Sequence, residues 1–155
     1  MIKFQSVGPV IAMIAIALVS TGVVAPFGLA QEKKVEHAEH QKMMQDCAKA
    51  CSDCQRSCDM CATHCAHMLH QGKKEHVMTL MTCQDCSTFC AAASQITARG
   101  GPFAKLICTS CADACARCGM ACEKHPDDSH MKACAEECRR CEKSSKDMVK
   151  HMMSK

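Results

Sequence analysis

The chain contains 17 cysteines, and within each of four blocks neighbouring cysteines are separated by three or four positions. An α-helix completes one turn in 3.6 residues, so this spacing places all the thiols of a block on one face of a helix. Four helices that turn these faces toward one axis would enclose a column of soft metal ligands. The blocks are Cys47, Cys51, Cys54, Cys58, Cys61, Cys65; Cys83, Cys86, Cys90; Cys108, Cys111, Cys115, Cys118, Cys122; and Cys134, Cys138, Cys141.

Turn-forming residues separate the blocks and divide the chain into four expected helices. Gly72 suits a helix end, Gly100-Gly101-Pro102 ends one helix and opens the next, and His125-Pro126-Asp127-Asp128 makes a third break. The helices then cover residues 41–69, 74–98, 102–124 and 128–152, after a frayed tail or first turn at residues 31–40. Short connections favour antiparallel neighbours, so we predict an all-α, up-down-up-down antiparallel four-helix bundle with a cysteine-lined core.

The composition narrows the function classes. A length of 155 residues fits one domain, and the absence of Trp and Tyr with only four Phe excludes an ordinary aromatic core. The net charge of +3 is modest and no basic run alternates with aromatic residues, so we expect no nucleic-acid partner. No nucleophile, base and orienting group converge in the sequence, so we expect a binding protein and not an enzyme.

The first 30 residues are typical of a secretory signal peptide. Lys3 precedes an apolar run of about ten residues, Val10 to Val19, and Gly28-Leu29-Ala30 offers small residues for cleavage. We therefore expect a signal peptide at residues 1–30, a mature domain at 31–155 that carries all the cysteines, a periplasmic or extracytoplasmic location, and no membrane segment after cleavage. An uncleaved anchor is the alternative, although the run is short for a span of about 20 residues.

Disulfides and conventional zinc or iron–sulfur sites are two explanations of the cysteine pattern. In a disulfide-stabilised exported structural or stress protein the thiols would pair, but neighbours on one helical stripe have parallel Cβ directions, and an odd number leaves one thiol over. Cross-helix disulfides remain open. A zinc or iron–sulfur protein would show separate CxxC knuckles or a cluster motif, whereas here the CxxC and CxxxC pairs tile continuously.

Cu(I) fits the pattern best, because it accepts two or three sulfur ligands and is selected by thiolate and thioether. Each CxxxC pair places two sulfurs about one turn apart on one face, where they can bind one ion. Since the pairs tile along each helix, we predict multiple Cu(I) ions in a column. Thiolates and ions balance in charge, so a filled core carries no large unpaired charge.

The two ends of the bundle differ in composition. Continuing the cysteine stripes places a group of His and Met residues at one end, which we interpret as a soft mouth for copper. At the other end Ile96, Phe103, Leu106 and Ile107 suggest an apolar plug, with His40, Met44, Met148 and Met152 finishing the packing or forming a second port. The expected mouth ligands are His64, Met68, His76, His125 and Met131, with His130 close by.

These motifs resemble those of the four-helix-bundle copper storage protein family. The resemblance covers residues 40–152 and includes the CxxxCxxCxxxCxxCxxxC run of Cys47 to Cys65 and the CxxCxxxCxxCxxxC run of Cys108 to Cys122. It implies a Cys-lined Cu(I)-binding bundle that stores or sequesters copper for copper homeostasis, with about one ion per thiol. It further implies a homo-oligomer, as a tetramer, and delivery of copper to client proteins. A detoxifying sponge for Cu, Zn or Cd would need the same core.

Overall fold

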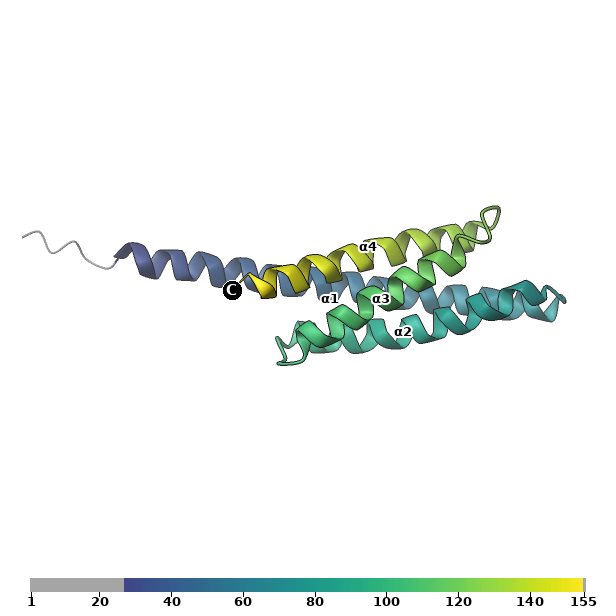
Figure 1. Cartoon of the computed structure of the whole chain (residues 1–155), viewed down its shortest axis with the longest axis horizontal. Coiled ribbons are helices and arrows are strands. Elements are labelled where there is room, and N and C mark those ends of the chain that lie inside the picture. Colours follow the sequence, from purple (N-terminus) through teal and green to yellow (C-terminus); the bar gives the residue numbers. More distant parts are fainter. Residues whose placement is uncertain (1–26, 155) are drawn as a thin grey trace, which may run out of the picture.

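The structure is a computed structural model that describes residues 27–154. It contains four α-helices, α1 (Phe27–His70), α2 (Val77–Ala98), α3 (Ala104–Cys122) and α4 (Ser129–Met153), with a short 3-10 turn, η1 (Lys74–His76), before α2 (Figure 1). The described residues form no strand. The main difference from the expected helices is α1, which already includes residues 31–40. Its 44 residues make it twice as long as α2, with 22, and its first turns project beyond the bundle (Figure 1).

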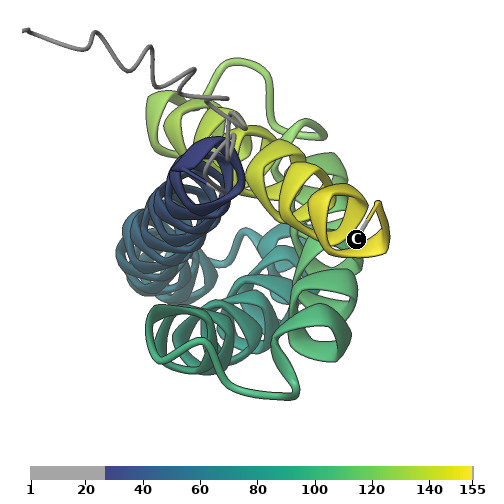
Figure 2. The same cartoon turned by 90° about the vertical axis from the view of Figure 1, so that its left-hand side faces the viewer.

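The helices surround one axis in chain order, as the end-on view shows (Figure 2). α1 packs against α2 and α4, α3 also packs against α2 and α4, and α1 lies diagonally across from α3. Each connection is short, so consecutive helices run antiparallel. The predicted up-down-up-down four-helix bundle is confirmed.

Two glycines and one aspartate set the helix ends. Gly72 has φ +83° and Gly100 has φ +60°, left-handed conformations that residues with a Cβ rarely adopt. Past each of them a backbone amide bonds back to the helix that ends there, Lys73 N to Met68 O at 3.0 Å and Gly101 N to Ile96 O at 3.0 Å. Asp128 caps α4 by accepting bonds from the amides of His130 and Met131.

The interior is built from small and sulfur-containing side chains. All 17 cysteines are at most 1% exposed, and buried Ala and Met residues complete the core. Phe89 and Phe103 are exposed at 41% and 64%. The expected apolar plug is therefore wrong in part, because Phe103 and Leu106 face outward from the first turns of α3, while Ile96 and Ile107 pack against the core. Burial in this protein consequently depends on thiols.

Candidate metal centre

The thiols form one continuous column along the bundle axis. Each is buried and none is bonded to another sulfur. The shortest Sγ–Sγ separations among the hydrogen-bond contacts are 3.6 Å, between Cys90 and Cys115 and between Cys83 and Cys118, well beyond a disulfide bond of about 2.05 Å. The column therefore consists of free thiols in van der Waals or weak hydrogen-bonding contact.

Thiols from diagonal helices meet across the axis. Although α1 and α3 are not neighbours in the ring of helices, their cysteines approach each other in register, one pair for each turn. The pairs are Cys47–Cys108 and Cys51–Cys111, both at 3.9 Å, Cys54–Cys115 at 3.8 Å, and Cys58–Cys118 at 3.9 Å. Cysteines of α2 and α4 fill the other two sides, as in the contacts Cys86–Cys115 and Cys54–Cys138, both at 3.8 Å.

Thirteen of the thiols gather into five overlapping sets of four. Within each set all four Sγ atoms lie within 4.8 Å of one another. The set of Cys61, Cys83, Cys122 and Cys134 takes one thiol from each helix. The other sets are Cys54, Cys86, Cys90, Cys115; Cys54, Cys58, Cys86, Cys138; Cys58, Cys118, Cys134, Cys138; and Cys90, Cys111, Cys115, Cys141. Adjacent sets share thiols, so a single sulfur can bridge two ions.

Because the sets share thiols, the number of ions that the column can hold depends on the charge of the ion. A tetrahedral Zn²⁺ with bonds of about 2.3 Å needs sulfurs about 3.8 Å apart, which single sets satisfy. At most three sets can be filled at once without sharing a thiol. Four separate sets would need 16 thiols, and the five sets together contain only 13. Cu(I) accepts two or three sulfurs and needs only one thiolate charge per ion. The column therefore has room for few divalent ions but for many Cu(I) ions.

Hydrogen bonding between thiols changes their acidity. A bond with Cys122 lowers the pKa of Cys118 to about 7, and a bond with Cys115 lowers that of Cys111 to about 5. Desolvation by burial raises the pKa of Cys65 to about 12. Hydrogen bonds within the column therefore favour the thiolate at some positions, whereas burial favours the protonated thiol at others, which release a proton when a metal binds.

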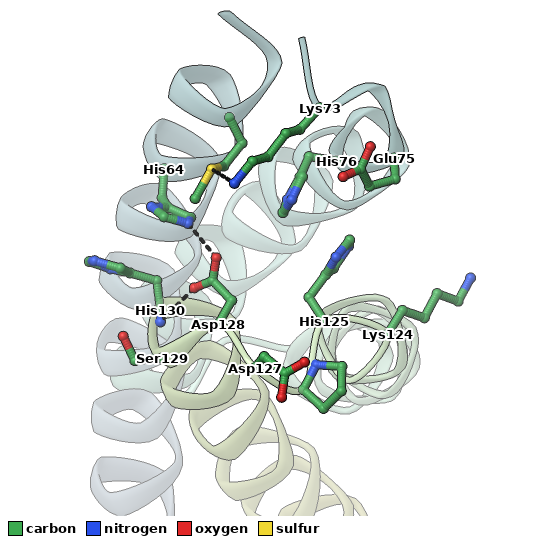
Figure 3. Close-up of a pocket in the computed structure, with 12 residues that line it drawn as sticks. His64, Lys73, Glu75, His76, Lys124, His125, Asp127, Asp128, Ser129 and His130 are labelled. Carbon is green, nitrogen blue, oxygen red and sulfur yellow. Dashed lines mark hydrogen bonds and ion pairs between the residues drawn. The ribbon is translucent and has the colours of Figure 1, made fainter. Parts of the chain in front are cut away.

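Four histidines gather at the end of the column formed by the α1–α2 and α3–α4 connections. His64 and His130 stack with ring centroids 4.4 Å apart, and His76 and His125 stack at 4.2 Å. With Met68 they line a pocket of about 680 Å³, in which the two pairs face each other (Figure 3). We call this group the histidine end. The structure thus brings together all the residues expected at the mouth, except that Met131 lies beneath the pocket.

The donors at the histidine end change from imidazole outside to sulfur inside. Met131 is fully buried, and the Cys61 thiol donates to its Sδ at 3.4 Å. His76 is 5% exposed, and its Nδ1 is buried without a hydrogen-bond partner in the described residues. Desolvation and the nearby His125 lower the pKa of His76, so its imidazole is neutral and has a lone pair to offer. An unsatisfied buried nitrogen in a pocket that Met68 also lines fits a soft metal ion.

Asp128 adds a carboxylate to the histidine end, although the sequence pattern indicated only a break between helices at this position. Its Oδ2 lies 2.7 Å from His64 Nε2, and its Oδ1 accepts the amide of His130 (Figure 3). Burial alone would raise the pKa of this carboxyl, but His64 and the capping amides lower it below 3.8. A carboxylate commonly orients a metal-binding histidine in this way. The sequence signal was its position, two residues before His130 and three before Met131.

We expect Asp128→Ala to lower the free energy of unfolding by about 1 kcal/mol, the usual cost of a lost cap, and Asp128→Asn by less because it retains a capping oxygen. The folded pKa is depressed, so the contribution of the carboxylate charge is present above 3.8 and is lost as pH falls through the folded value. Urea unfolding at neutral and acidic pH should show the difference between wild type and Asp128→Asn shrinking in acid. A constant difference would contradict the assigned charge interaction.

Two hydroxyls interrupt the column at its other end. Ser145 follows Cys141 on the α4 stripe, and its Oγ lies 4.0 Å from Cys47 Sγ and 3.9 Å from Cys51 Sγ. Thr97 follows Cys90 on the α2 stripe and lies 3.3 Å from Cys108 Sγ. Both are fully buried. Cys47, Cys51, Cys65 and Cys108 belong to none of the five sets.

The chain is similar in sequence to known cysteine-rich proteins. A family model described as copper storage protein matches residues 39–150. An uncharacterized cysteine-rich protein of Bacillus subtilis, YhjQ, is 34% identical over 109 residues, covering 67% of this chain and 87% of the relative.

Solved structures share the fold. The Cu(I)-bound copper storage protein BsCsp3 has a TM-score of 0.63 at 33% identity and covers 69% of this chain and 98% of its own. A cytosolic copper storage protein from Streptomyces lividans, in a structure with five coppers, has a TM-score of 0.65 at 26% identity, with 72% and 96% covered.

The expectation of export is contradicted by these comparisons, since the similar Streptomyces lividans protein is described as cytosolic. The apolar run from Val10 to Val19 lies outside the described residues, and Ala30, the expected cleavage position, lies inside the continuous helix α1. A short apolar run is a compositional signal, and composition alone proved an unreliable guide to location. No described helix has both the length and the apolar character needed to cross a membrane.

Proposed function

Because this chain belongs to the copper storage protein family, we propose that it stores or sequesters many Cu(I) ions on the thiols of its bundle core. The observation that carries this proposal is the set of overlapping four-thiol groups, in which seven thiols serve two groups each: Cys54, Cys58, Cys86, Cys90, Cys115, Cys134 and Cys138. Shared sulfurs suit a chain of monovalent ions. We assign all 17 cysteines as ligands and residues 31–155 as the copper-binding domain.

The proposal is tested by an anaerobic titration of the fully reduced protein with Cu(I) against a competing chromophoric chelator. We expect uptake on the order of one ion per thiol, because each Cu(I) needs one thiolate for neutrality. Parallel titration with Zn²⁺ should stop near three ions, the number of sets without a common thiol. Uptake of only one or two Cu(I) ions would contradict a store and would favour a small metal centre or a disulfide protein.

We assign the histidine end as the port through which Cu(I) reaches the column, with His64, Met68, His76, His125 and Met131 as its ligands. Its support is the donor order from half-buried imidazoles through Met131 to Cys61, which allows an ion to move by ligand exchange. His76 supplies the nitrogen that lacks a partner among the described residues.

Removing three imidazoles from the port should slow loading without changing capacity. Loss of even an outer partner of a metal-binding histidine typically costs 10- to 100-fold, so loss of three ligands in His64→Ala/His76→Ala/His125→Ala should slow Cu(I) uptake by about tenfold or more. Stopped-flow absorbance of the copper–thiolate bands measures the rate. His37→Ala, at an exposed position on α1, is the matched control. Equal uptake rates for the triple variant and the control would show that the histidine end is not the port for Cu(I).

The exposed side chains Met78, Phe89 and Met120 support association with further copies of the chain. They line a shared groove between α2 and α3. We propose a homo-oligomer, tetrameric by its resemblance to the family, that holds copper for delivery to client proteins. Light scattering of the purified protein reads out this assembly directly.

A further inference from the structure

The bundle end opposite the histidine end, where α4 ends and which faces the viewer in Figure 2, carries a further pair of histidines. His40 of α1 and His151 of α4 stack with ring centroids 5.2 Å apart. His151 Nε2 lies 3.1 Å from His40 Nδ1. Both side chains are half-buried. The extension of α1 toward its N-terminus places His40 beside the last turn of α4, so the pair depends on both elements.

Two methionines lie between this pair and the thiols. Met44 follows His40 by one turn on α1 and is 7% exposed, and Met148 precedes His151 by one turn on α4 and is fully buried. One turn deeper come Cys47 and Ser145, whose Sγ and Oγ atoms are 4.0 Å apart. The stripe of soft donors therefore continues without an apolar gap along α1 from His40 through Met44 to Cys47.

Both ends of the column thus share one order of donors. At the histidine end, imidazoles lie outside, Met131 is buried beneath them, and Cys61 follows at 3.4 Å. At the opposite end His40 and His151 lie outside, Met44 and Met148 are buried beneath them, and Cys47 follows. Packing alone needs apolar volume at these positions but gives no reason for imidazole above thioether above thiol at both ends.

We propose that His40 and His151, with the thioethers of Met44 and Met148, form a second Cu(I) site that serves as a slower port at this end of the column. The inference rests on the proposed function, since a port needs a column that accepts copper. Two nitrogens 3.1 Å apart can both lie about 2.0 Å from one ion in a bent arrangement. The hydrogen bond between these two nitrogens breaks when both bind the ion, and its proton moves to the other nitrogen of the donor ring.

The hydroxyls explain why this port is the slower one. Ser145 and Thr97 stand where further thiols would continue the α4 and α2 stripes, and a hydroxyl is a poor ligand for Cu(I). An ion that leaves Met44 or Met148 therefore has Cys47 and Cys108 as its nearest thiols, which contact each other at 3.9 Å. At the histidine end a buried hydroxyl, Thr79, also precedes Cys83 on the α2 stripe, but Met131 contacts Cys61 of the first four-thiol set directly at 3.4 Å.

The test measures Cu(I) loading of the full chain in a background that lacks the faster port. Cu(I) is supplied anaerobically as its complex with a chromophoric chelator to His64→Ala/His76→Ala/His125→Ala protein. In this background we add either His40→Ala/His151→Ala or Met44→Leu/Met148→Leu. Leu replaces Met with nearly the same volume, so the second pair removes the sulfur while retaining the packing. Met60→Leu/Met81→Leu, at positions 66% and 54% exposed, is the matched control.

We expect both added pairs to reduce the remaining loading rate by about tenfold, the lower range for loss of a partner in a metal shell, and the control to leave it unchanged. With methyl-labelled methionine, the Met44 and Met148 resonances should shift within the first equivalent of Cu(I) in this background. Unchanged rates with unmoved resonances, in protein that still fills to its full capacity, would overturn the second port. Failure of every variant to take up more than one or two ions would overturn the proposed function instead.

Discussion

Loading the reduced protein with Cu(I) should raise its thermal unfolding midpoint by several tens of degrees. The metal binds the folded column tightly because only the bundle brings thiols of four helices within 4.8 Å. A ligand present at 1,000 times its dissociation constant stabilises the folded state by about 4 kcal/mol for each site. Three such ions would contribute about 12 kcal/mol, and for a domain of this size each kcal/mol shifts the midpoint by about 4 °C.

Circular dichroism of the helical signal measures the two midpoints directly. Removing the copper with excess chelator should return the midpoint to that of the reduced protein, which shows that the shift comes from bound metal. An unchanged midpoint after full loading would mean that copper binds outside the preformed core.

Breaking the four-thiol sets should cause the largest loss of tightly held copper. The effect is seen by comparing two variants that lack the same number of thiols. Cys54→Ser/Cys86→Ser/Cys90→Ser/Cys115→Ser removes at least two thiols from three of the five sets. Its matched control is Cys47→Ser/Cys51→Ser/Cys65→Ser/Cys108→Ser, which removes four thiols and breaks no set. Serine is compatible with the interior, because Ser145 is already fully buried against Cys47 and Cys51.

Both quadruple variants retain 13 of the 17 thiols. Against a strong Cu(I) chelator, we expect the first variant to keep roughly half of the tightly held copper of the wild type and the control to lose no more than about one ion per missing thiol, because shared sulfurs stabilise neighbouring ions. Metal analysis after gel filtration from the chelator measures the retained ions. Equal retention by the two variants would show that the sets do not determine affinity and that only the number of thiols matters.

Conclusions about location needed more than composition. The apolar run near the N-terminus favoured export, yet a structurally similar copper storage protein is described as cytosolic. Ala30, the expected cleavage position, lies in the helix that also carries Cys47 to Cys65.

The sequence by itself determined the four helices, their antiparallel order and the inward thiol face of each, because the three- and four-residue spacing is a local property of a helix. It also predicted which His and Met residues gather at the histidine end, since short connections fix which helix ends are neighbours. Periodicity could not give the rotation and register of one helix against another, which long-range packing sets.

Only the tertiary structure therefore decided that α1 and α3 thiols meet across the axis, and that Cys61, Cys83, Cys122 and Cys134 form one set. It also decided that Phe103 and Leu106 face outward at the first turns of α3, where the plug was expected. Asp128 and His64, which are in contact, are separated by 64 positions in the chain, and His151 and His40 are separated by 111. Such contacts arise from the packing of separate helices, and no local pattern in the chain specifies them.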